Sequence, residues 1–565
     1  MEYTKIKNRR DLAEWLGIPL SELTYVLYVK GIDSYYSSFS IPKKDGSDRI
    51  IEASQGSLKY IQRKLAFQLQ QRQKNIWEEK GIQPNISHAF QKGKSIITNA
   101  SVHKNKHIVV KVDLKDFFHS FHFGRVKGFF EKSSAFAVDP SIAIIIAQLT
   151  CYKGRLPQGA PSSPIITDLI CNIMDMRILS LAKEYRVDYT RYADDLTFST
   201  NDRRFIEQES SFMIDLEKEV KRAGFELNQE KTIIQYHNSR QIVTGLVVNE
   251  KVSVKRDYYK KTRAMASHLY NDGLFYINGE PGTIQELEGR FSFINQIDQW
   301  NNKHKKEPSR ALSAREKEYK KFLIYKYFYC SEKPVLITEG KTDNRYISAA
   351  LKNRKDDYPN LIQLNHHGDE SWFNYEYYIF QPTKRINFFF DYCGGGGDSF
   401  MKILDLYYDN NREINYIEWF KNHTNAKPKN PVILVYDNEH TKKRPLVKAI
   451  NRVYGDKTVS EILNGLDDTG FINLKDNLYI LTMPKKVDKD IEIEDLFNDF
   501  ELKMIRIDGR TYIKHFEKNP DYREEKHFSK NAFSLYVDSN YKNIDFSGFK
   551  PFLDALSSIV DDYRK

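Results

Sequence analysis

Two adjacent aspartates, Asp194 and Asp195, interrupt a segment that otherwise has the composition of paired β-strands. The letters DYTR before the YADD sequence and LTFS after it predict a strand, a tight turn and a second strand over 188–200. Neighbouring carboxylates at the tip of such a hairpin repel each other and lose hydration as the chain folds. A divalent cation removes that cost, so the hairpin indicates a metal site, although an exposed Asp-Asp turn is common in isolation.

Asp113 is a third carboxylate in a similar setting. It lies near the end of the apolar segment HIVVKVDL (107–114), which predicts a strand, where a core residue is expected. Taken alone, it is equally well an aspartate that caps the next turn. If the strands pair, Asp113 joins Asp194 and Asp195, and two Mg²⁺ ions held by the three would activate a 3′ hydroxyl and stabilise a leaving pyrophosphate.

The segment LPQGAPSSP (156–164) predicts a tight loop that opens a long helix. Gly159 allows the backbone to approach a ligand closely, and a helix N-terminus suits the phosphate of a template or nucleotide. Without the neighbouring motifs this segment is merely a loop.

In these three segments the chain resembles the reverse transcriptases, because VDLKDFF, LPQGAPSSP and YADD occur in that family's order and spacing. The resemblance covers about the first 320 residues. It implies an RNA-directed DNA polymerase that uses deoxynucleoside triphosphates and two Mg²⁺ ions. It also implies a right-hand α+β fold, with fingers at 1–105, a split-βαβ palm at 106–250, and a helical thumb with its linker at 251–325.

The same resemblance assigns nucleotide-binding residues. Lys43 or Lys44 would grip the incoming triphosphate together with Arg49, and Phe118 stands at the position of the side chain that excludes a ribose 2′-OH. Gln158 would contact the nucleotide or template, and Lys231, in the sequence NQEKT, would lie near the phosphates. The predicted nucleotide-binding set is Lys43, Arg49, Phe118, Gln158 and Lys231.

Two shorter sequences resemble elements of the retron branch of the family. These are NASVH (99–103) and VTG (243–245), which stand in the expected places around the polymerase motifs. The resemblance implies a cognate non-coding RNA that serves as template and primer, priming from a guanosine 2′-OH, and a branched RNA–DNA product, the multicopy single-stranded DNA. It predicts RNA binding by Asn99, His103, Val243, Thr244 and Gly245.

The charge distribution agrees with a nucleic-acid partner for the first part of the chain. Residues 1–330 contain 52 Lys and Arg against 38 Asp and Glu, whereas 331–565 contain 35 against 38. A basic half is typical of a nucleic-acid binder, although many solvated surfaces are also rich in lysine. The four cysteines are scattered, and no apolar run reaches the ~20 residues that span a bilayer. We therefore expect a protein of the bacterial cytoplasm, without a membrane partner and possibly homo-oligomeric.

The C-terminal part has a different pattern. Five apolar segments alternate with helical stretches and predict a parallel α/β sheet: PVLIT, LIQLN, INFFF, PVILVY and NLYILTM. Glu339 follows the first of these segments, and Asp437 and Glu439 follow the fourth. Residues i and i+2 of an extended chain point the same way, so the last two can share a metal ion. The alternatives are a helix cap at Asp343, a simple turn at Asp437 and a flexible linker at Gly394–Gly397.

Together these features resemble a TOPRIM domain, which would occupy 331–565 with a C-terminal extension. The resemblance implies a Rossmann-like fold and one or two Mg²⁺ or Mn²⁺ ions on Glu339, Asp437 and Glu439, although Glu439 stands where that fold carries an aspartate. IEIEDLF (491–497) adds Glu494, and KHFSK (526–530) offers a basic phosphate contact. Because we find no zinc cluster, P-loop or topoisomerase tyrosine motif, the resemblance favours a nuclease of the overcoming-lysogenization-defect kind.

The combined interpretation is a retron reverse transcriptase whose branched product restrains a fused nuclease effector, for antiphage defence by abortive infection. Two alternatives stay open. The C-terminal half is a non-catalytic module that binds nucleic acid, or the chain is the reverse transcriptase of a mobile element such as a group II intron. The latter is expected to carry a maturase region and an HNH endonuclease, and neither pattern is seen.

Overall fold

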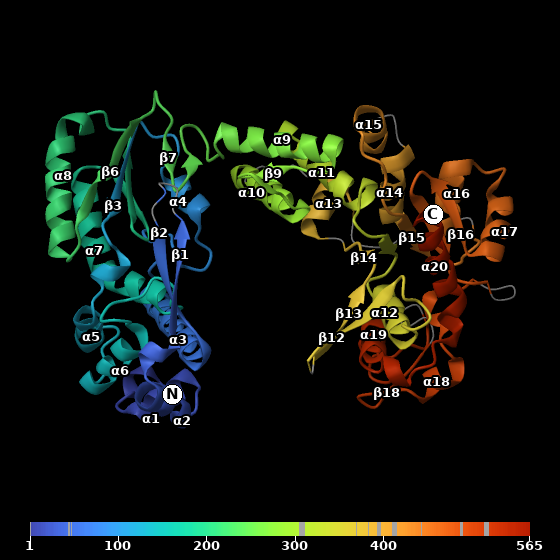
Figure 1. Ribbon diagram of the computed structural model, residues 1–565, viewed down its shortest axis with the longest axis horizontal. Helices are drawn as coiled ribbons and strands as arrows, with labels where there is room; N and C mark the ends of the chain where they lie inside the picture. The colour runs from blue at the N-terminus through green and yellow to red at the C-terminus, as the bar shows by residue number, and fades with distance from the viewer. Residues whose placement is uncertain are drawn as a thin grey trace. The chain divides into compact units, whose positions relative to one another are not determined.

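The computed structural model describes residues 2–564 except 43–45, 47, 304–310, 369, 382, 393–396, 409–414, 442, 486–489 and 514–518. The chain divides into two compact units (Figure 1). Unit 1 contains Met1–Tyr259 and Gln296–Lys306, and unit 2 contains Lys260–Asn295 and Glu307–Lys565. Each unit is described by itself.

The first part of the chain begins with helices and continues with a mixture of helices and antiparallel strands. The helices are α1 Arg9–Leu16, α2 Leu20–Thr24, α3 Gly56–Glu79, α4 Ile96–Val102, α5 Phe123–Lys132, α6 Pro140–Thr150, α7 Ser163–Glu184 and α8 Phe205–Arg222. The strands are β1 Tyr36–Pro42, β2 Asp48–Ser54, β3 Ile108–Leu114, β4 Asp188–Tyr192, β5 Asp195–Thr200, β6 Leu227–Tyr236, β7 Ile242–Val243 and β8 Leu246–Val247.

The centre of unit 1 is a four-stranded sheet in the order β4-β5-β3-β6, in which every neighbouring pair is antiparallel. Helix α7 packs against α8 and β4 (Figure 1), and its buried residues join the strands in one hydrophobic core. The strand β3 is buried at five of its seven positions, because its sequence IVVKVDL is apolar on both faces. This arrangement confirms the antiparallel palm sheet with helices that the sequence predicts.

The second part of the chain has its own set of elements. The helices are α9 Arg256–Asp272, α10 Ile284–Asn302, α11 Ala314–Ile324, α12 Asp343–Asn353, α13 Lys384–Phe390, α14 Gly397–Tyr408, α15 Tyr416–His423, α16 Pro445–Tyr454, α17 Val459–Thr469, α18 Asp499–Met504, α19 Lys530–Ser539 and α20 Lys550–Arg564. The strands are β9 Tyr276–Ile277, β10 Glu280–Pro281, β11 Val335–Thr338, β12 Ile362–His367, β13 Glu370–Tyr375, β14 Tyr378–Ile379, β15 Val432–Tyr436, β16 Phe471–Lys475, β17 Leu478–Thr482, β18 Arg506–Ile507 and β19 Arg510–Thr511.

Unit 2 is built around a five-stranded sheet in the order β14-β11-β15-β17-β16. Its strands are parallel except β16, which forms an antiparallel hairpin with β17. All five residues of β15 are buried. Val432, Leu434 and Tyr436 face one hydrophobic core, whereas Ile433 and Val435 face another. Alternate side chains of a strand point to opposite faces, so helices cover both faces of this sheet, as expected for a parallel sheet.

Two of the five predicted strands do not belong to this sheet. The segment LIQLN pairs only with β13 in a separate hairpin. The segment INFFF lies in helix α13, which begins where the Thr383 hydroxyl accepts a hydrogen bond from the Ile386 amide. Its buried residues Ile386, Phe389 and Phe390 have the three- and four-residue spacing of a helix, so the prediction of a strand there was wrong.

The predicted thumb groups mainly with unit 2. Helices α9 and α10 place Leu269, Tyr270 and Phe291 in the same hydrophobic core as the sheet residue Val432. Of the predicted thumb and linker at 251–325, Lys260–Asn295 and the part after Lys306 group with unit 2, whereas Gln296–Lys306 groups with unit 1. Within the described residues, no helix combines the length and the apolar character that crossing a bilayer requires.

Candidate active site

The three polymerase carboxylates lie at one end of the antiparallel sheet of unit 1. Tyr192 pairs with Asp195 across the β4–β5 hairpin, so Ala193 and Asp194 form its turn, and Ala193 has a positive φ of 56°. On the next strand, Asp113 is the cross-strand partner of Asp195. The backbone of β3 holds the turn directly, because the Leu114 amide donates to the Asp194 carbonyl at 3.0 Å. Strand pairing therefore brings the three predicted carboxylates together.

The electrostatics of these groups suit a cation. Burial, followed by the charges of Asp195 and Asp113, raises the pKa of Asp194 to about 6. Burial also raises the pKa of Asp195. The Asp113 carboxylate accepts hydrogen bonds from Lys231 Nζ at 3.2 Å and from Asn228 Nδ2 at 3.3 Å.

The donor set fits Mg²⁺, because a cation would relieve the repulsion that raises the pKa of Asp194. In the part of the chain that the structure describes, no group of three or more histidine, cysteine or acidic side chains is gathered tightly enough to hold a metal ion as it stands. Metal binding by Asp113, Asp194 and Asp195 together therefore requires these side chains to move closer to one another.

A cavity of about 690 Å³ opens beside these carboxylates. It collects most of the predicted nucleotide-binding side chains with two of the acids: Arg49, Phe118, Gln158, Lys231, Asp113 and Asp194. Lys43 and Lys44 lie outside the described residues. The residues Lys115, His119 and Asn228 also line the cavity. Lys115 belongs to the motif VDLKDFF and Asn228 to NQEKT, whereas His119 belongs to none of the motifs quoted above.

The LPQG loop is held against the strand that carries Arg49. The Gln158 carbonyl accepts a hydrogen bond from the Glu52 amide at 2.9 Å. Gly159 has a φ of +141°, and a Cβ atom there would lie 2.7 Å from the Glu52 carbonyl oxygen. Only glycine fits this close approach, so Gly159 fixes the place of Gln158 in the cavity.

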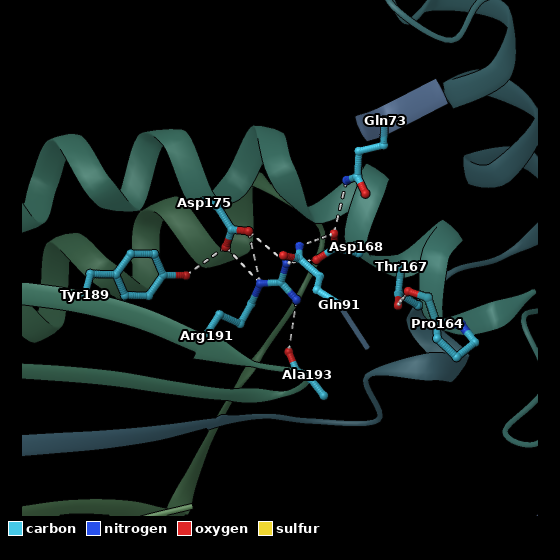
Figure 2. Close-up of polar contacts among 9 residues, drawn as sticks. All are labelled: Gln73, Gln91, Pro164, Thr167, Asp168, Asp175, Tyr189, Arg191 and Ala193. Carbon is cyan, nitrogen blue, oxygen red and sulfur yellow. Dashed lines mark hydrogen bonds and ion pairs between the residues drawn. The ribbon is translucent and has the colours of Figure 1, made fainter. Parts of the chain in front are cut away.

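A buried charged network lies beneath the β4–β5 hairpin (Figure 2). The Arg191 guanidinium donates to both carboxylate oxygens of Asp175, at 2.9 and 2.8 Å, and to Asp168 at 3.0 Å. It also donates to the Ala193 carbonyl of the turn at 3.3 Å. Gln73 and Gln91 donate to the second oxygen of Asp168 at 3.2 and 2.9 Å.

This network connects the hairpin to helix α7, which carries Asp168 and Asp175, and to helix α3, which carries Gln73. The Arg191 side chain is only 2% exposed. A sequence signal existed, since Asp168 and Asp175 are seven residues apart and therefore share one face of an otherwise apolar helix. The motifs around YADD do not reveal it, because neither aspartate belongs to one.

The NASVH residues form a second buried network. The His103 ring contacts Ser199 Oγ at 2.8 Å and Thr190 Oγ1 at 2.7 Å, and Thr190 donates to Asn99 Oδ1 at 2.6 Å. Asn99 and His103 are fully buried, and burial lowers the pKa of His103 to about 3. They join α4 to the palm strands and offer no surface to RNA.

The VTG residues pack beside the same helix. The Thr244 hydroxyl donates to the Ile96 carbonyl at the start of α4, at 3.1 Å. Val243 is fully buried, whereas Gly245 is exposed in the turn with a φ of +84°. Asn99, His103 and Val243 are thus buried, whereas Thr244 and Gly245 are at least partly accessible. RNA binding by these five residues stays a prediction.

The acidic residues of unit 2 lie at the carboxyl ends of neighbouring parallel strands. Glu339 directly follows β11, and Asp437 directly follows β15. Burial, and then the charges of Asp343, Glu339 and Glu494, raise the pKa of Asp437 well above its ordinary value. We call Glu339, Asp343, Asp437 and Glu494 the C-terminal acidic cluster.

Ion pairs hold two further acids of unit 2, Glu494 and Glu439. Glu494 contacts Lys530 Nζ at 2.6 Å, so a cation already lies at the edge of the cluster. Glu439 is buried and paired with Arg444 at 3.1 Å. Asp343, read from the sequence as a possible helix cap, accepts a hydrogen bond from the Gly340 amide at 2.7 Å.

Comparisons with known proteins agree with the polymerase site. A family model described as reverse transcriptase (RNA-dependent DNA polymerase) matches residues 41–258. The retron Mx162 reverse transcriptase of Myxococcus xanthus is 34% identical over 325 residues, which are 52% of this chain and 65% of that protein. The retron Ec86 reverse transcriptase of Escherichia coli is 31% identical over 319 residues, which are 56% of this chain and 92% of that protein.

The chain thus spans less than two thirds of the Myxococcus relative and nearly all of the Escherichia coli one. A telomerase structure from Candida albicans, in complex with a fragment of telomeric RNA, has a TM-score of 0.31 and 11% identity. The similarity covers 51% of this chain and 60% of that one.

Proposed function

This chain belongs to the retron reverse transcriptases, and from that premise we propose that it copies a cognate non-coding RNA into branched multicopy single-stranded DNA. The observation that carries the proposal is the cavity of unit 1. It gathers Asp113 and Asp194 with four side chains that the sequence assigns to nucleotide binding. Reverse transcriptases generally depend on Mg²⁺, and the mutual repulsion of the carboxylates that raises the pKa of Asp194 supports binding of such an ion beside them.

Each residue has a physical role in this proposal. Asp113, Asp194 and Asp195 would hold the cations, which supply activation of the 3′ hydroxyl and neutralise the leaving pyrophosphate. Arg49 and Lys231 would neutralise the triphosphate. The contact of Lys231 with Asp113 at 3.2 Å, and the position of both in the lining of the same cavity, support this role.

The experiment is to purify the protein from its host and to sequence the nucleic acid that accompanies it. We expect one RNA species joined through a 2′ branch to DNA copied from it. The double variant Asp194→Asn with Asp195→Asn should retain the RNA and lose the DNA, while Asp188→Asn, on the same hairpin but away from its tip, should keep both. Normal DNA yield from a folded double variant would refute the site.

We further propose that unit 2 is a TOPRIM-like, metal-dependent nuclease. Its support is the C-terminal acidic cluster at the carboxyl ends of β11 and β15, where ligands of open α/β sheets usually bind. Carboxylates that face a polyanion repel it unless a cation lies between them, so Mg²⁺ or Mn²⁺ on Glu339 and Asp437 would explain the cluster.

The alternative is a unit 2 that binds nucleic acid without cleaving it. One observation favours it, namely the ion pair between Glu439 and Arg444, which occupies an acid that the resemblance assigns to metal binding. In the nuclease proposal Glu494 or Asp343 takes that place. The biological role that follows is antiphage defence, in which the branched DNA restrains the nuclease until infection disturbs it.

A further inference from the structure

Unit 2 contains a second cavity, whose described lining includes Lys341, the residue between Glu339 and Asp343 in the sequence, but none of the four acids of the C-terminal acidic cluster. Its volume is about 550 Å³. Six of its lining side chains carry the argument: Lys341, Arg345, Ser348, Lys352, Tyr375 and Asp538. Nothing in the sequence motifs pointed to this cavity.

The basic side chains follow one face of helix α12. Arg345, Ser348 and Lys352 are separated by three and four residues, which places them on the same side of the helix. Lys341 precedes the helix by two residues and lines the same cavity. Three cations therefore form a row along one wall, which runs away from the acidic cluster.

The basic side chains that line the cavity outnumber the acidic ones. Lys352 pairs with Asp538 at 2.7 Å. Arg345, by contrast, donates to two neutral groups, Asn531 Oδ1 at 2.7 Å and Ser534 Oγ at 2.8 Å. These bonds fix the guanidinium without neutralising it. The described lining contains three cations and one carboxylate, so the cavity attracts anions.

The row begins within the acidic cluster itself. Lys341 lies between Glu339 and Asp343 in the sequence, and both acids belong to the cluster that raises the pKa of Asp437. A phosphodiester brought to those acids meets repulsion, and neighbouring phosphates of the same strand need cations a few ångströms away. On the wall of α12, Arg345 and Lys352 are seven residues apart, which is about 10.5 Å along the helix axis, and Lys341 precedes the helix.

We propose that this cavity binds the sugar–phosphate backbone of a single nucleic-acid strand and directs it to the C-terminal acidic cluster. Lys341, Arg345 and Lys352 bind the phosphates, and Tyr375 offers a half-buried ring against which a base can stack. The inference rests on the proposed nuclease function and adds to it the substrate class, a single strand held by its phosphates. DNA and RNA share that chemistry.

Photocrosslinking tests the site in the full-length protein. The probes are a 20-nucleotide DNA with 4-thiothymidine and an RNA of the same sequence with 4-thiouridine, bound in EDTA so that no cleavage occurs. Mass spectrometry of the crosslinked peptides should recover 341–352 or Tyr375. Comparison of the DNA and RNA probes shows which of the two nucleic acids the cavity prefers.

Variants give the matched comparison. Lys341→Gln with Arg345→Gln should reduce crosslinking at Tyr375 about tenfold, and the slope of its yield against salt should become shallower by about 0.7 for each cation removed. Lys355→Gln, beyond the end of α12 and paired with Asp356, should change neither. If the double variant is unfolded by circular dichroism, Lys341→Gln alone, at an exposed position, gives the same test.

The outcomes separate this inference from the nuclease proposal. Crosslinks in the cavity without any Mg²⁺- or Mn²⁺-dependent cleavage support the binding site and refute the nuclease. Cleavage that persists without crosslinks at these residues, or crosslinks that are unchanged in the double variant, overturns the binding site and leaves the nuclease standing.

Discussion

The carboxyl group of Asp194 has a pKa of about 6, raised from an ordinary 3.8 by burial and by Asp195 and Asp113. Between about pH 4 and pH 6, the carboxyl group of Asp194 is therefore mostly protonated in the folded state and mostly ionised in the unfolded chain. The free energy of unfolding should fall as pH rises from about 4 to about 6, because the folded state must then carry the unfavourable charge.

Mg²⁺ should reverse that loss. We expect the ion to raise the melting temperature more at about pH 7.5 than at about pH 5, where the proton on Asp194 competes with it. Thermal unfolding with Mg²⁺ titrated at both values measures the difference. In Asp194→Asn, the rise of the melting temperature caused by Mg²⁺ should be nearly the same at both pH values. An equal rise at both pH values in the unchanged protein would contradict the assignment of Asp194 as a metal ligand.

Phe118 determines the choice of sugar if its place in the cavity has the predicted role. The side chain is half-buried, lines the cavity beside Asp113 and packs edge-to-face on Phe117 at 5.4 Å. Phe118→Ala should raise kcat/KM for ribonucleotides relative to deoxynucleotides by about tenfold or more, because a steric exclusion is removed. Phe118→Tyr keeps the bulk of the ring and should keep the discrimination. Single-nucleotide extension with both substrates decides, and unchanged ratios in the alanine variant would refute the role.

The β4–β5 hairpin depends on the charged network beneath it. Arg191→Met leaves Asp168 and Asp175 buried without their cation, which costs about 3–5 kcal/mol, and it removes the bond to the Ala193 carbonyl. We expect lower stability together with loss of DNA synthesis, and partial recovery of both in Arg191→Lys. Asp188 lies on the same strand as Arg191 and forms a more exposed salt bridge with Lys106. Breaking this salt bridge by Asp188→Asn should cost less than about 1 kcal/mol. Urea unfolding and primer extension measure these effects. Equal losses in Arg191→Met and Asp188→Asn would show that the network does not support the hairpin.

Elements with a strong local pattern could be predicted from the sequence, whereas those set by tertiary packing could not. The hairpin around Asp194 and the buried strand of Asp113 follow from alternating apolar residues, and their pairing brings the acids together as expected. The segment INFFF was misread, because a short apolar run has the same composition in a strand and in a buried helix. The burial of Asn99 and His103 depends on Thr190 and Ser199, about ninety residues away in the sequence, and no local pattern reveals such contacts.

At the scale of the whole molecule, one hydrophobic core of unit 2 contains side chains of both the predicted thumb and the predicted C-terminal domain. Leu269, Phe291 and Leu287 of the thumb helices share that core with Tyr319 and Val432. Salt bridges add to it, since Glu288 of α10 contacts Lys326 and Arg385 at 2.5 and 3.2 Å. Truncation after residue 330 would expose apolar side chains of α9 and α10, so the thumb and the C-terminal half are not separable folding units. Point substitutions are therefore the sound way to separate their functions.

The two proposed activities can be separated by such substitutions, because their acids lie in different units. Glu339→Ala or Asp437→Ala removes a carboxylate from the C-terminal acidic cluster and leaves Asp113, Asp194 and Asp195 unchanged. We expect normal amounts of branched DNA, together with loss of toxicity and of phage protection, since binding of the catalytic cation requires those oxygens. Glu370→Ala, an exposed acid on β13, serves as the control and should behave as the unchanged protein. The measurements are the yield of branched DNA, and growth when that DNA is degraded in cells that express each variant with its RNA. If both cluster variants remain toxic and protective while making normal DNA, the nuclease proposal is wrong, and unit 2 is better understood as a module that binds nucleic acid.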